Sequence, residues 1–266
     1  MPRFRLTVAY DGTDFHGWQK QHPPGEAPLR TVQGVMEETA RLVLREPVNI
    51  VGASRTDSGV HALGQVAALS TETPWELERL RRAMNARLPK DVQIRDVAET
   101  HETFSPISEA TNKGYRYTIA HGVADGAPRP LFDRRYVSMC PNTLDAERMH
   151  EAAAHLIGEH DFASLTRLHH GRESTVREIF SCDVTRPAEH RIAIDVSGNG
   201  FLYNMVRIIA GTLMEVGRGK WEPGEIPRIL EAKDRSAAGP TLPPEGLCLM
   251  WIRYDQADVG DGAHPA

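Results

Sequence analysis

Residues 53–62 read Ala-Ser-Arg-Thr-Asp-Ser-Gly-Val-His-Ala and form a short polar turn between two apolar runs. Short polar side chains and glycine are also typical of an ordinary surface turn. Two features favour a functional loop: Arg55 lies two residues from Asp57, and the flanking Val, Ala and Leu residues indicate partial burial. An arginine near a partly buried carboxylate keeps that carboxylate ionised. Asp57 is therefore the candidate covalent nucleophile of the chain.

The elements on either side of this loop predict an α+β unit. Alternating apolar residues predict strands, and apolar residues at helical spacing predict helices. The expected elements are a strand at 4–10, a helix from Thr31 to Pro47, short strands at 48–51 and 65–69, a helix from Thr73 with Leu77, Leu80, Met84 and Leu88 inward, and a strand at 92–97. That order of strands and helices is typical of a ferredoxin-like unit.

The second of these helices has a clear expected start and a basic surface. Thr73, Pro74 and Glu76 form the pattern of an N-cap, a first-turn proline and a capping box. The basic residues are Arg79, Arg81, Arg82, Arg87 and Lys90. Such a cluster is either a solvated helix face or a contact surface for an anionic partner.

The second half predicts a less regular α+β unit. We expect strands at 115–119, 179–184, 192–196 and 247–251, helices from Thr143 to near Gly158, at 201–216 and at 223–230, and a polar loop around 169–174. The predicted organisation is two α+β halves with mainly antiparallel sheets, 1–105 and 106–255, with a cleft between them and a disordered tail at 256–266.

Two residues of the second half stand out as candidates for a site in that cleft. Tyr115 begins a Tyr-Arg-Tyr strand and is either a core aromatic or a platform for a stacked base. Arg207 lies within the most apolar helix, where a charge is costly unless it sits at the helix edge or pairs with a buried carboxylate. A surface ion pair is the alternative interpretation of Arg207, and the apolar neighbours of this residue argue against it. Together with Asp57, these groups suit a bound base and its phosphates.

Composition excludes several classes of protein. The three cysteines of this 266-residue chain are widely spaced, and no metal-ligand motif occurs, so neither a disulfide framework nor a metal or cofactor site is expected. The sequence has no secretory apolar core and no run of roughly 20 apolar residues, which predicts a cytoplasmic protein without a membrane segment. A net charge of −5 leaves a nucleic-acid partner possible in principle, because a local basic cleft matters more than the total.

Several motifs along the chain resemble one enzyme family. The matching segments are 10–19 (YDGTDFHGWQ), 54–62 (SRTDSGVHA), 113–117 (KGYRY), 158–164 (GEHDFAS), 200–207 (GFLYNMVR) and 245–249 (EGLCL). They resemble, in the same order, segments of tRNA pseudouridine synthases of the TruA type, which act on positions 38, 39 and 40 of the anticodon arm. The resemblance implies the pseudouridine synthase fold, built from two ferredoxin-like or RRM-like halves, with no cofactor.

The resemblance also assigns roles to individual residues. Asp57 corresponds to the family's nucleophile, and Tyr115 to the tyrosine that stacks on the target base and is proposed to help remove its C5 proton. Arg207 corresponds to the arginine that pairs with the catalytic carboxylate. Arg55 corresponds to a motif arginine implicated in holding the flipped nucleotide, which must leave the stack to be reached.

Further implications concern partners. In this family the enzyme is a homodimer and tRNA lies across both subunits. Arg79, Arg82 and their neighbours Arg81 and Arg87 then become candidate phosphate contacts.

Some residues depart from the family pattern. Ser54 stands where glycine is usual and Ser58 where alanine is usual, and both changes could alter the geometry of the loop. The segment 104–107 lacks a histidine that the family often has there, so a substrate contact from this segment is in doubt.

Two other functions are compatible with the residues. One is an RNA-binding protein of two RRM-like units without catalysis, although binding alone does not require a carboxylate where phosphates gather. The other is a hydrolase with Asp57 as nucleophile, but no second acid or metal set occurs at suitable spacing.

Overall fold

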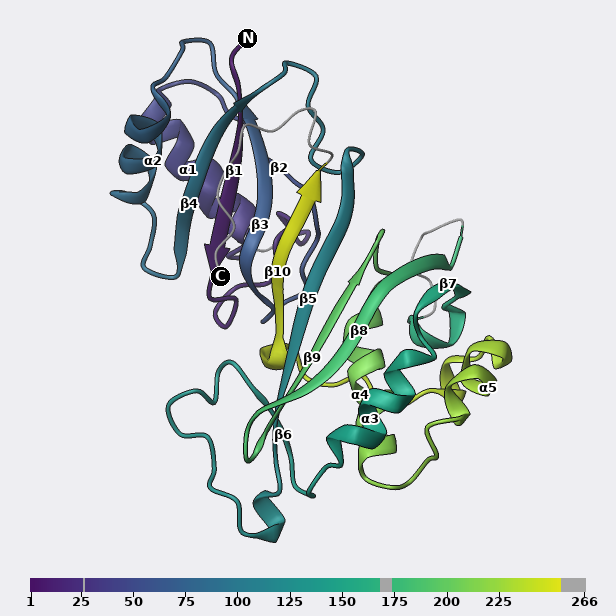
Figure 1. Cartoon of the computed structure of the whole chain (residues 1–266). Helices are drawn as coiled ribbons and strands as arrows, with labels where there is room; N and C mark the ends of the chain where they lie inside the picture. The colour runs from purple at the N-terminus through teal and green to yellow at the C-terminus, as the bar shows by residue number, and fades with distance from the viewer. Residues whose placement is uncertain (26, 168–173, 255–266) are drawn as a thin grey trace. The chain divides into compact units, whose positions relative to one another are not determined.

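The chain forms two compact units in a computed structural model that describes residues 1–25, 27–167 and 174–254 (Figure 1). The first unit is Met1–Thr111 together with the chain from Leu249, and the second is Asn112–Cys248. The halves expected from the sequence are 1–105 and 106–255. They differ from these units because they place the last strand in the second half. The expected tail at 256–266 and most of the expected polar loop at 169–174 lie outside the described residues.

The first unit contains antiparallel strands and two helices that contact each other. Its elements are β1 (Arg3–Tyr10), α1 (Val32–Leu44), β2 (Val51–Gly52), β3 (His61–Ser70), α2 (Leu77–Asn85), β4 (Val92–Thr100) and β10 (Leu247–Tyr254). The strand order is β4-β1-β3-β10, with β2 beside β3. This sequence of elements from β1 to β4 confirms the predicted strand and helix order of the first half.

The core of the first unit follows from the period of its strands and helices. Phe4, Leu6 and Val8 of β1 are buried on one face, as alternation predicts, and Met36 and Ala40 of α1 are fully buried. Removing such side chains from water stabilises the unit by about 1.5–3 kcal/mol for each large one. α1 begins where the sequence predicts, because the Thr31 hydroxyl accepts a hydrogen bond from the Gly34 backbone N–H at 3.3 Å.

Two expectations for the first unit are wrong, both because side chains bond to the backbone. The strand expected at 48–51 is reduced to β2 (Val51–Gly52), since side chains of α1 take up the N–H and C=O of Ile50. α2 begins at Leu77 rather than near Thr73, since the Glu76 carboxylate accepts hydrogen bonds from the N–H groups of residues 78 and 79 and caps the helix itself.

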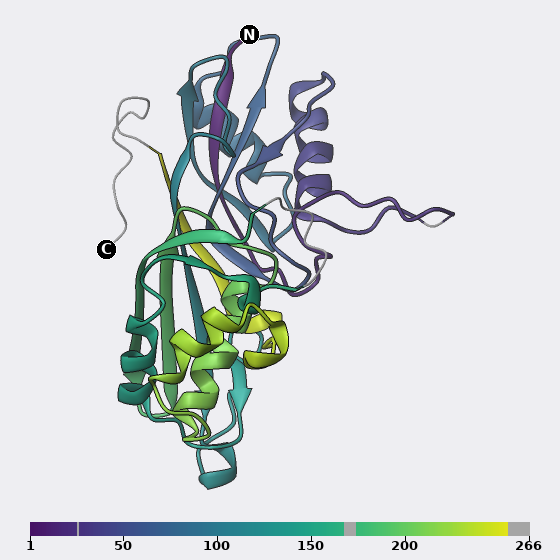
Figure 2. The same ribbon diagram turned by 90° about the vertical axis from the view of Figure 1, so that its right-hand side faces the viewer.

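The second unit contains a further set of paired strands and three helices (Figure 2). Its elements are β5 (Ala110–His121), β6 (Ser138–Cys140), α3 (Ala146–Ala154), β7 (Gly158–Asp161), β8 (Val176–Ala188), β9 (Arg191–Gly198), α4 (Met205–Gly217) and α5 (Glu225–Ala232). The strand order is β5-β9-β8-β7, all antiparallel, with β6 parallel to β5. α3 packs against β8 and α4. The α+β class predicted from the sequence is confirmed.

The second unit differs from the prediction at the starts of α3 and α4 and at β7. α3 begins after Asp145, because Thr143 is held outside the helix by two hydrogen bonds to the Asp125 carboxylate. α4 begins at Met205 rather than Phe201, after Asn204 adopts a left-handed backbone conformation with φ of 60°. The sequence does not predict β7, because Gly-Glu-His-Asp has no apolar alternation. In the described parts of the chain, every helix is too short or too polar to cross a membrane.

Candidate active site

The loop that carries Asp57 is fixed at the backbone on both sides of that residue. Before it, the Ala53 N–H donates to the Val66 carbonyl at 2.8 Å, and the fully buried Gln65 side chain bonds both the N–H and the C=O of Ser54. After it, the Val60 N–H donates to the Asp57 carbonyl at 3.2 Å and closes a tight turn. Asp57 is half-buried, and its position is set by a rigid frame rather than by a mobile loop tip.

The N-terminal motif at residues 10–19 forms the support of this loop. The Tyr10 and Thr56 hydroxyl groups are 2.8 Å apart in a buried hydrogen bond, and the Trp18 N–H donates to the Thr56 carbonyl at 3.1 Å. The Phe15 carbonyl accepts from the Gly59 N–H at 3.2 Å and from the Ser58 hydroxyl at 3.1 Å. Two motifs that are distant in the sequence therefore form one structure around Asp57.

Two glycines allow this close approach. A Cβ atom on Gly12 would lie 2.0 Å from the Val60 carbonyl oxygen, and one on Gly17 would lie 2.7 Å from the Thr56 carbonyl oxygen. Gly17 also has φ of +87°, a conformation that residues with a side chain rarely adopt. The glycines of the 10–19 motif are explained by the backbone of the Asp57 loop.

Other residues of the loop have distinct surroundings. The side chain of Arg55 is exposed to solvent. Ser58, one of the departures from the family pattern, adds the hydrogen bond to Phe15 that an alanine could not make. Ser54, the other departure, is held through its backbone by Gln65.

Tyr115 lies on β5 of the second unit with its side chain largely buried. The residue pairs with Val196 of β9, and its ring meets Phe201 edge to face, with the ring centroids 5.2 Å apart. Phe201 lies just before the start of α4. The tyrosine ring is thus fixed by a second aromatic ring, an arrangement that favours a defined ring plane.

The sequence allowed Arg207 either at the helix edge or in a pair with a buried carboxylate. Arg207 lies in the first turn of α4, near the edge of the helix. Its Nε donates to the Leu242 carbonyl at 2.7 Å, and its Nη1 donates to the Asn204 side-chain oxygen at 2.8 Å. The neighbouring Pro243 carbonyl accepts from the Tyr117 hydroxyl at 2.7 Å, and burial raises the pKa of Tyr117. Residues 242–243 therefore join Arg207 to the strand that carries Tyr115.

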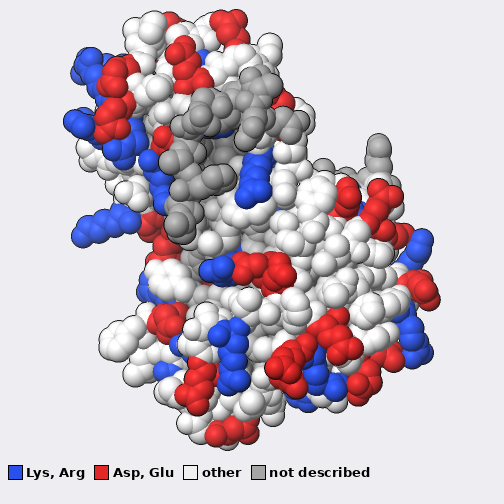
Figure 3. Space-filling model, in the orientation of Figure 1, with Lys and Arg blue, Asp and Glu red and all other residues white. Residues whose placement is uncertain are grey.

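The basic cluster on α2 is partly neutralised within the helix. Arg81 and Arg82 both donate to the Glu78 carboxylate at 2.7 Å, and the Arg81 hydrogen bond is the largest effect that lowers the pKa of Glu78 to about 2. The Arg79 guanidinium lies over the Trp75 ring, 5.4 Å from its centroid. Figure 3 shows basic and acidic side chains interleaved over the part of the first unit where α2 lies.

The predicted site residues thus come from both units. Asp57, Arg55 and the α2 arginines belong to the first unit, and Tyr115 and Arg207 belong to the second, where residues 201–207 connect them. Gln65, which holds the Asp57 loop, was not predicted, because a glutamine within a strand of apolar residues gives no local signal. Within the described ranges, no group of three or more His, Cys, Asp or Glu side chains is placed to hold a metal ion.

The first unit holds a carboxylate on a rigid loop, and the second unit holds an aromatic ring and an arginine in defined positions. The family model described as tRNA pseudouridine synthase matches residues 6–125 and 152–255. The chain belongs to the tRNA pseudouridine synthase family, and the resemblance inferred from the motifs is confirmed.

Curated relatives extend over nearly the whole chain. Proteins named tRNA pseudouridine synthase A from Geotalea uraniireducens and Caldicellulosiruptor saccharolyticus are each 44% identical over 254 residues, covering 96% of this chain and 100% of theirs. The protein of that name from Sinorhizobium fredii is 44% identical over 257 residues, with the same coverage. A solved chain from a Cbf5-Nop10-Gar1 complex covers 80% of this chain and 54% of its own length at 11% identity and a TM-score of 0.33, and we draw nothing from so distant a likeness.

Proposed function

We propose that the protein isomerises uridine to pseudouridine at one or more of positions 38, 39 and 40 in the anticodon arm of tRNA, with Asp57 as the nucleophile. Membership of the family establishes the general activity: the chain is an isomerase that forms pseudouridine in tRNA. The observation that supports Asp57 as the nucleophile is its rigid support by Gln65 and by the 10–19 segment. Such a frame is what a reacting carboxylate requires, because small misplacements are costly to catalysis.

The reaction explains why few groups are needed. The N1–C1′ glycosidic bond breaks, the uracil turns, and a C5–C1′ bond forms, while one proton leaves C5 and N1 gains one. Because the product is an isomer of the substrate, no external oxidant or reductant is consumed. The protein must supply a nucleophile, a base for the C5 proton and a pocket that retains the freed ring. The target nucleotide must also leave the helical stack.

Each remaining candidate has a role in this scheme. Tyr115 stacks on the target base, and its hydroxyl helps remove the C5 proton. Arg207 pairs with the Asp57 carboxylate and keeps it ionised. Arg55, which is exposed beside Asp57, holds the flipped nucleotide through its phosphate.

Tyr115→Phe is expected to separate the stacking role from the proton-transfer role. The variant keeps the ring and its packing against Phe201, so the KM for tRNA stays near the wild-type value, while loss of a general base lowers kcat by about 10²-fold or more. Single-turnover kinetics on an unmodified tRNA transcript would measure both. Phe201→Leu, which removes only the supporting ring, is the matched control and should have a smaller effect on kcat. Wild-type turnover of Tyr115→Phe would remove the base role from this residue.

We also propose that the enzyme acts in the cytoplasm as a homodimer, with tRNA lying across both subunits. Arg79 and Arg82 on α2 are the candidate phosphate-binding residues of the first unit. Because Arg82 is bound to Glu78, its interaction with a phosphate has to compete with that carboxylate. Arg79 therefore contributes more to binding than Arg82.

Replacing both Arg79 and Arg82 by alanine is expected to weaken tRNA binding in a salt-dependent way. The slope of log Kd against log salt should fall by about 1 for each phosphate that the variant no longer neutralises. Arg228→Ala is the control, since Arg228 is another exposed arginine in an ion pair with a glutamate three residues away. An unchanged Kd and slope in the double variant would remove α2 from the tRNA-binding surface.

Tritium release from C5-labelled uridine tests the proposed function directly. Unmodified tRNA transcripts with uridine at position 38, 39 or 40 should release tritium, and transcripts with cytidine at all three positions should not. Release from the cytidine transcripts would place the target elsewhere in tRNA. Binding without release from any transcript would favour the RNA-binding protein without catalysis.

A further inference from the structure

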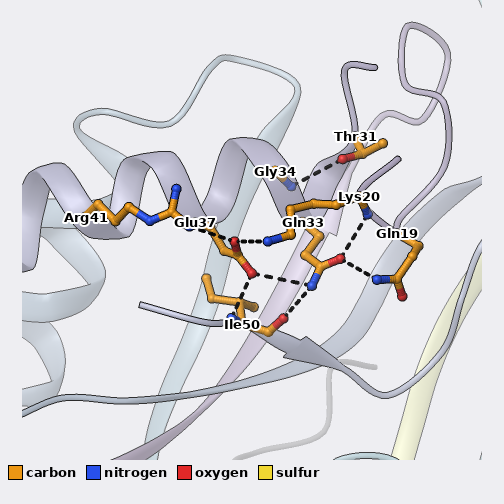
Figure 4. Close-up of polar contacts among 8 residues, drawn as sticks. All are labelled: Gln19, Lys20, Thr31, Gln33, Gly34, Glu37, Arg41 and Ile50. Carbon is orange, nitrogen blue, oxygen red and sulfur yellow. Dashed lines mark hydrogen bonds and ion pairs between the residues drawn. The ribbon is translucent and has the colours of Figure 1, made fainter. Parts of the chain in front are cut away.

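A carboxylate of α1 is buried in the first unit at a place the reaction scheme does not use. Glu37 is fully buried and accepts hydrogen bonds from four donors (Figure 4). One carboxylate oxygen accepts from Lys20 Nζ at 2.6 Å and from Arg41 Nη2 at 3.1 Å. The other accepts from the Ile50 N–H at 3.1 Å and from Gln33 Nε2 at 3.4 Å. A buried charge of this kind is costly unless all of its partners remain in place.

Gln33 lies one turn before Glu37 and extends the same network. Its side-chain oxygen accepts from the Lys20 N–H at 2.9 Å and from Gln19 Nε2 at 3.0 Å. Its amide nitrogen donates to the Ile50 carbonyl at 2.9 Å as well as to Glu37. Every hydrogen-bonding position of this amide is therefore used, so its orientation is fixed. Figure 4 shows the two side chains between the segment at 19–20 and the segment at Ile50.

Both segments held by this network run directly into the support of the catalytic loop. The first leads to Trp18, whose carbonyl accepts from the Gln33 N–H at 3.0 Å and whose N–H donates to the Thr56 carbonyl at 3.1 Å. The second leads from Ile50 to Gly52, which packs so closely on the Trp18 indole that a Cβ atom there would lie 2.3 Å from the ring. The network therefore contacts Trp18, which in turn contacts the backbone next to Asp57.

We propose that Glu37 is a positioning residue for Asp57, which it holds in place through the segments at 18–20 and 50–52. The carboxylate does not touch the substrate in this scheme. It keeps the ends of those two segments at a fixed distance from α1, and Trp18 transmits that position to Thr56.

Glu37→Gln tests this role, because it keeps the size of the side chain but removes the charge and puts an amide donor where another donor already points. At a temperature well below its unfolding transition, the variant is expected to lose about 10- to 10²-fold in kcat while its KM for tRNA changes little. Tritium release from tRNA measures both constants. A kcat within about twofold of wild type in the folded variant would overturn the proposal.

A matched pair of variants keeps the test informative if Glu37→Gln fails to fold. Lys20→Met and Arg41→Met each remove one cation from the same carboxylate oxygen, but only Lys20 belongs to the segment beside the loop. Both should lower the temperature of unfolding, and only Lys20→Met should lower kcat. Wild-type kcat values in both variants would show that the network acts on stability alone, and equally lowered values would overturn the distinct role of Lys20. If Lys20 bound tRNA instead, its loss would raise the KM and overturn its part in positioning.

The environment of Trp18 provides a readout that global stability does not affect. In protein labelled with 5-fluorotryptophan, the Trp18 resonance, assigned from a Trp18→Phe sample, should shift in Lys20→Met and stay unchanged in Arg41→Met. The proposal rests on Asp57 being the nucleophile, and the two can fail separately. Full turnover of an Asp57→Asn variant would remove the nucleophilic role of Asp57, whereas an inactive Asp57→Asn with normal kcat in Lys20→Met and Glu37→Gln would remove only the positioning role of Glu37.

Discussion

Asp57→Asn is expected to reduce pseudouridine formation to below about one-thousandth of the wild-type rate, a loss of about 4 kcal/mol in transition-state stabilisation. The amide has nearly the same shape as the carboxylate but carries no charge and is a poor nucleophile. The loop around it should keep its structure, because the backbone bonds of Ser54, Thr56 and Gly59 anchor it on both sides of residue 57. Affinity for tRNA should therefore change little.

Two further variants separate the charge of Asp57 from its position. Asp57→Glu keeps the charge but moves the carboxylate by one methylene, and in a rigid frame it should also lose most of its turnover. Asp96→Asn, at an exposed carboxylate on β4 of the same unit, is the matched control and should behave as wild type. Tritium release, tRNA binding and thermal unfolding would be measured for all three. Turnover by Asp57→Asn would exclude a nucleophilic role, and loss of its fold would indicate a structural one.

The parts of the fold that could be predicted are those set by apolar periodicity. The alternation of Phe4, Leu6 and Val8 locates β1, and Met36 and Ala40 locate the buried face of α1. The errors occur where a polar side chain replaces a backbone partner. Ile50 leaves the expected strand because side chains of α1 bond its backbone, and the Glu76 carboxylate shifts the start of α2. Such bonds depend on three-dimensional proximity, which a local pattern does not contain.

The candidate site divides in the same way. Asp57 could be selected because its turn combines an arginine, a carboxylate and a glycine in a short apolar setting. Gln33 and Glu37 carry only a weak sequence signal, two polar residues at i, i+4 spacing beside the buried stripe of α1. The support of the loop by Phe15 and Trp18 could not have been predicted from residues alone, because it consists of backbone bonds between distant segments.

Gly17→Ala is expected to damage both stability and catalysis, because the glycine is where the 10–19 segment touches the Asp57 loop. An alanine there meets two separate penalties: an unfavourable φ of +87°, and a Cβ atom 2.7 Å from the Thr56 carbonyl oxygen and 3.2 Å from the Asp57 carbonyl carbon. The groups in the way are backbone atoms, which cannot rotate aside. We expect the free energy of unfolding to fall by about 2–4 kcal/mol.

Gly25→Ala separates the two penalties. Gly25 has a similar φ of +79° in the same unit, but a Cβ atom on it would meet nothing within 4 Å. Its substitution should cost only the conformational penalty of about 1 kcal/mol and leave kcat unchanged. The folded fraction of Gly17→Ala should instead lose kcat, because relief of the clash moves the backbone of Thr56 and Asp57 away from its frame. Denaturant unfolding and tritium release would measure the two effects. A normal kcat in folded Gly17→Ala would mean that the position of Asp57 does not depend on the 10–19 segment.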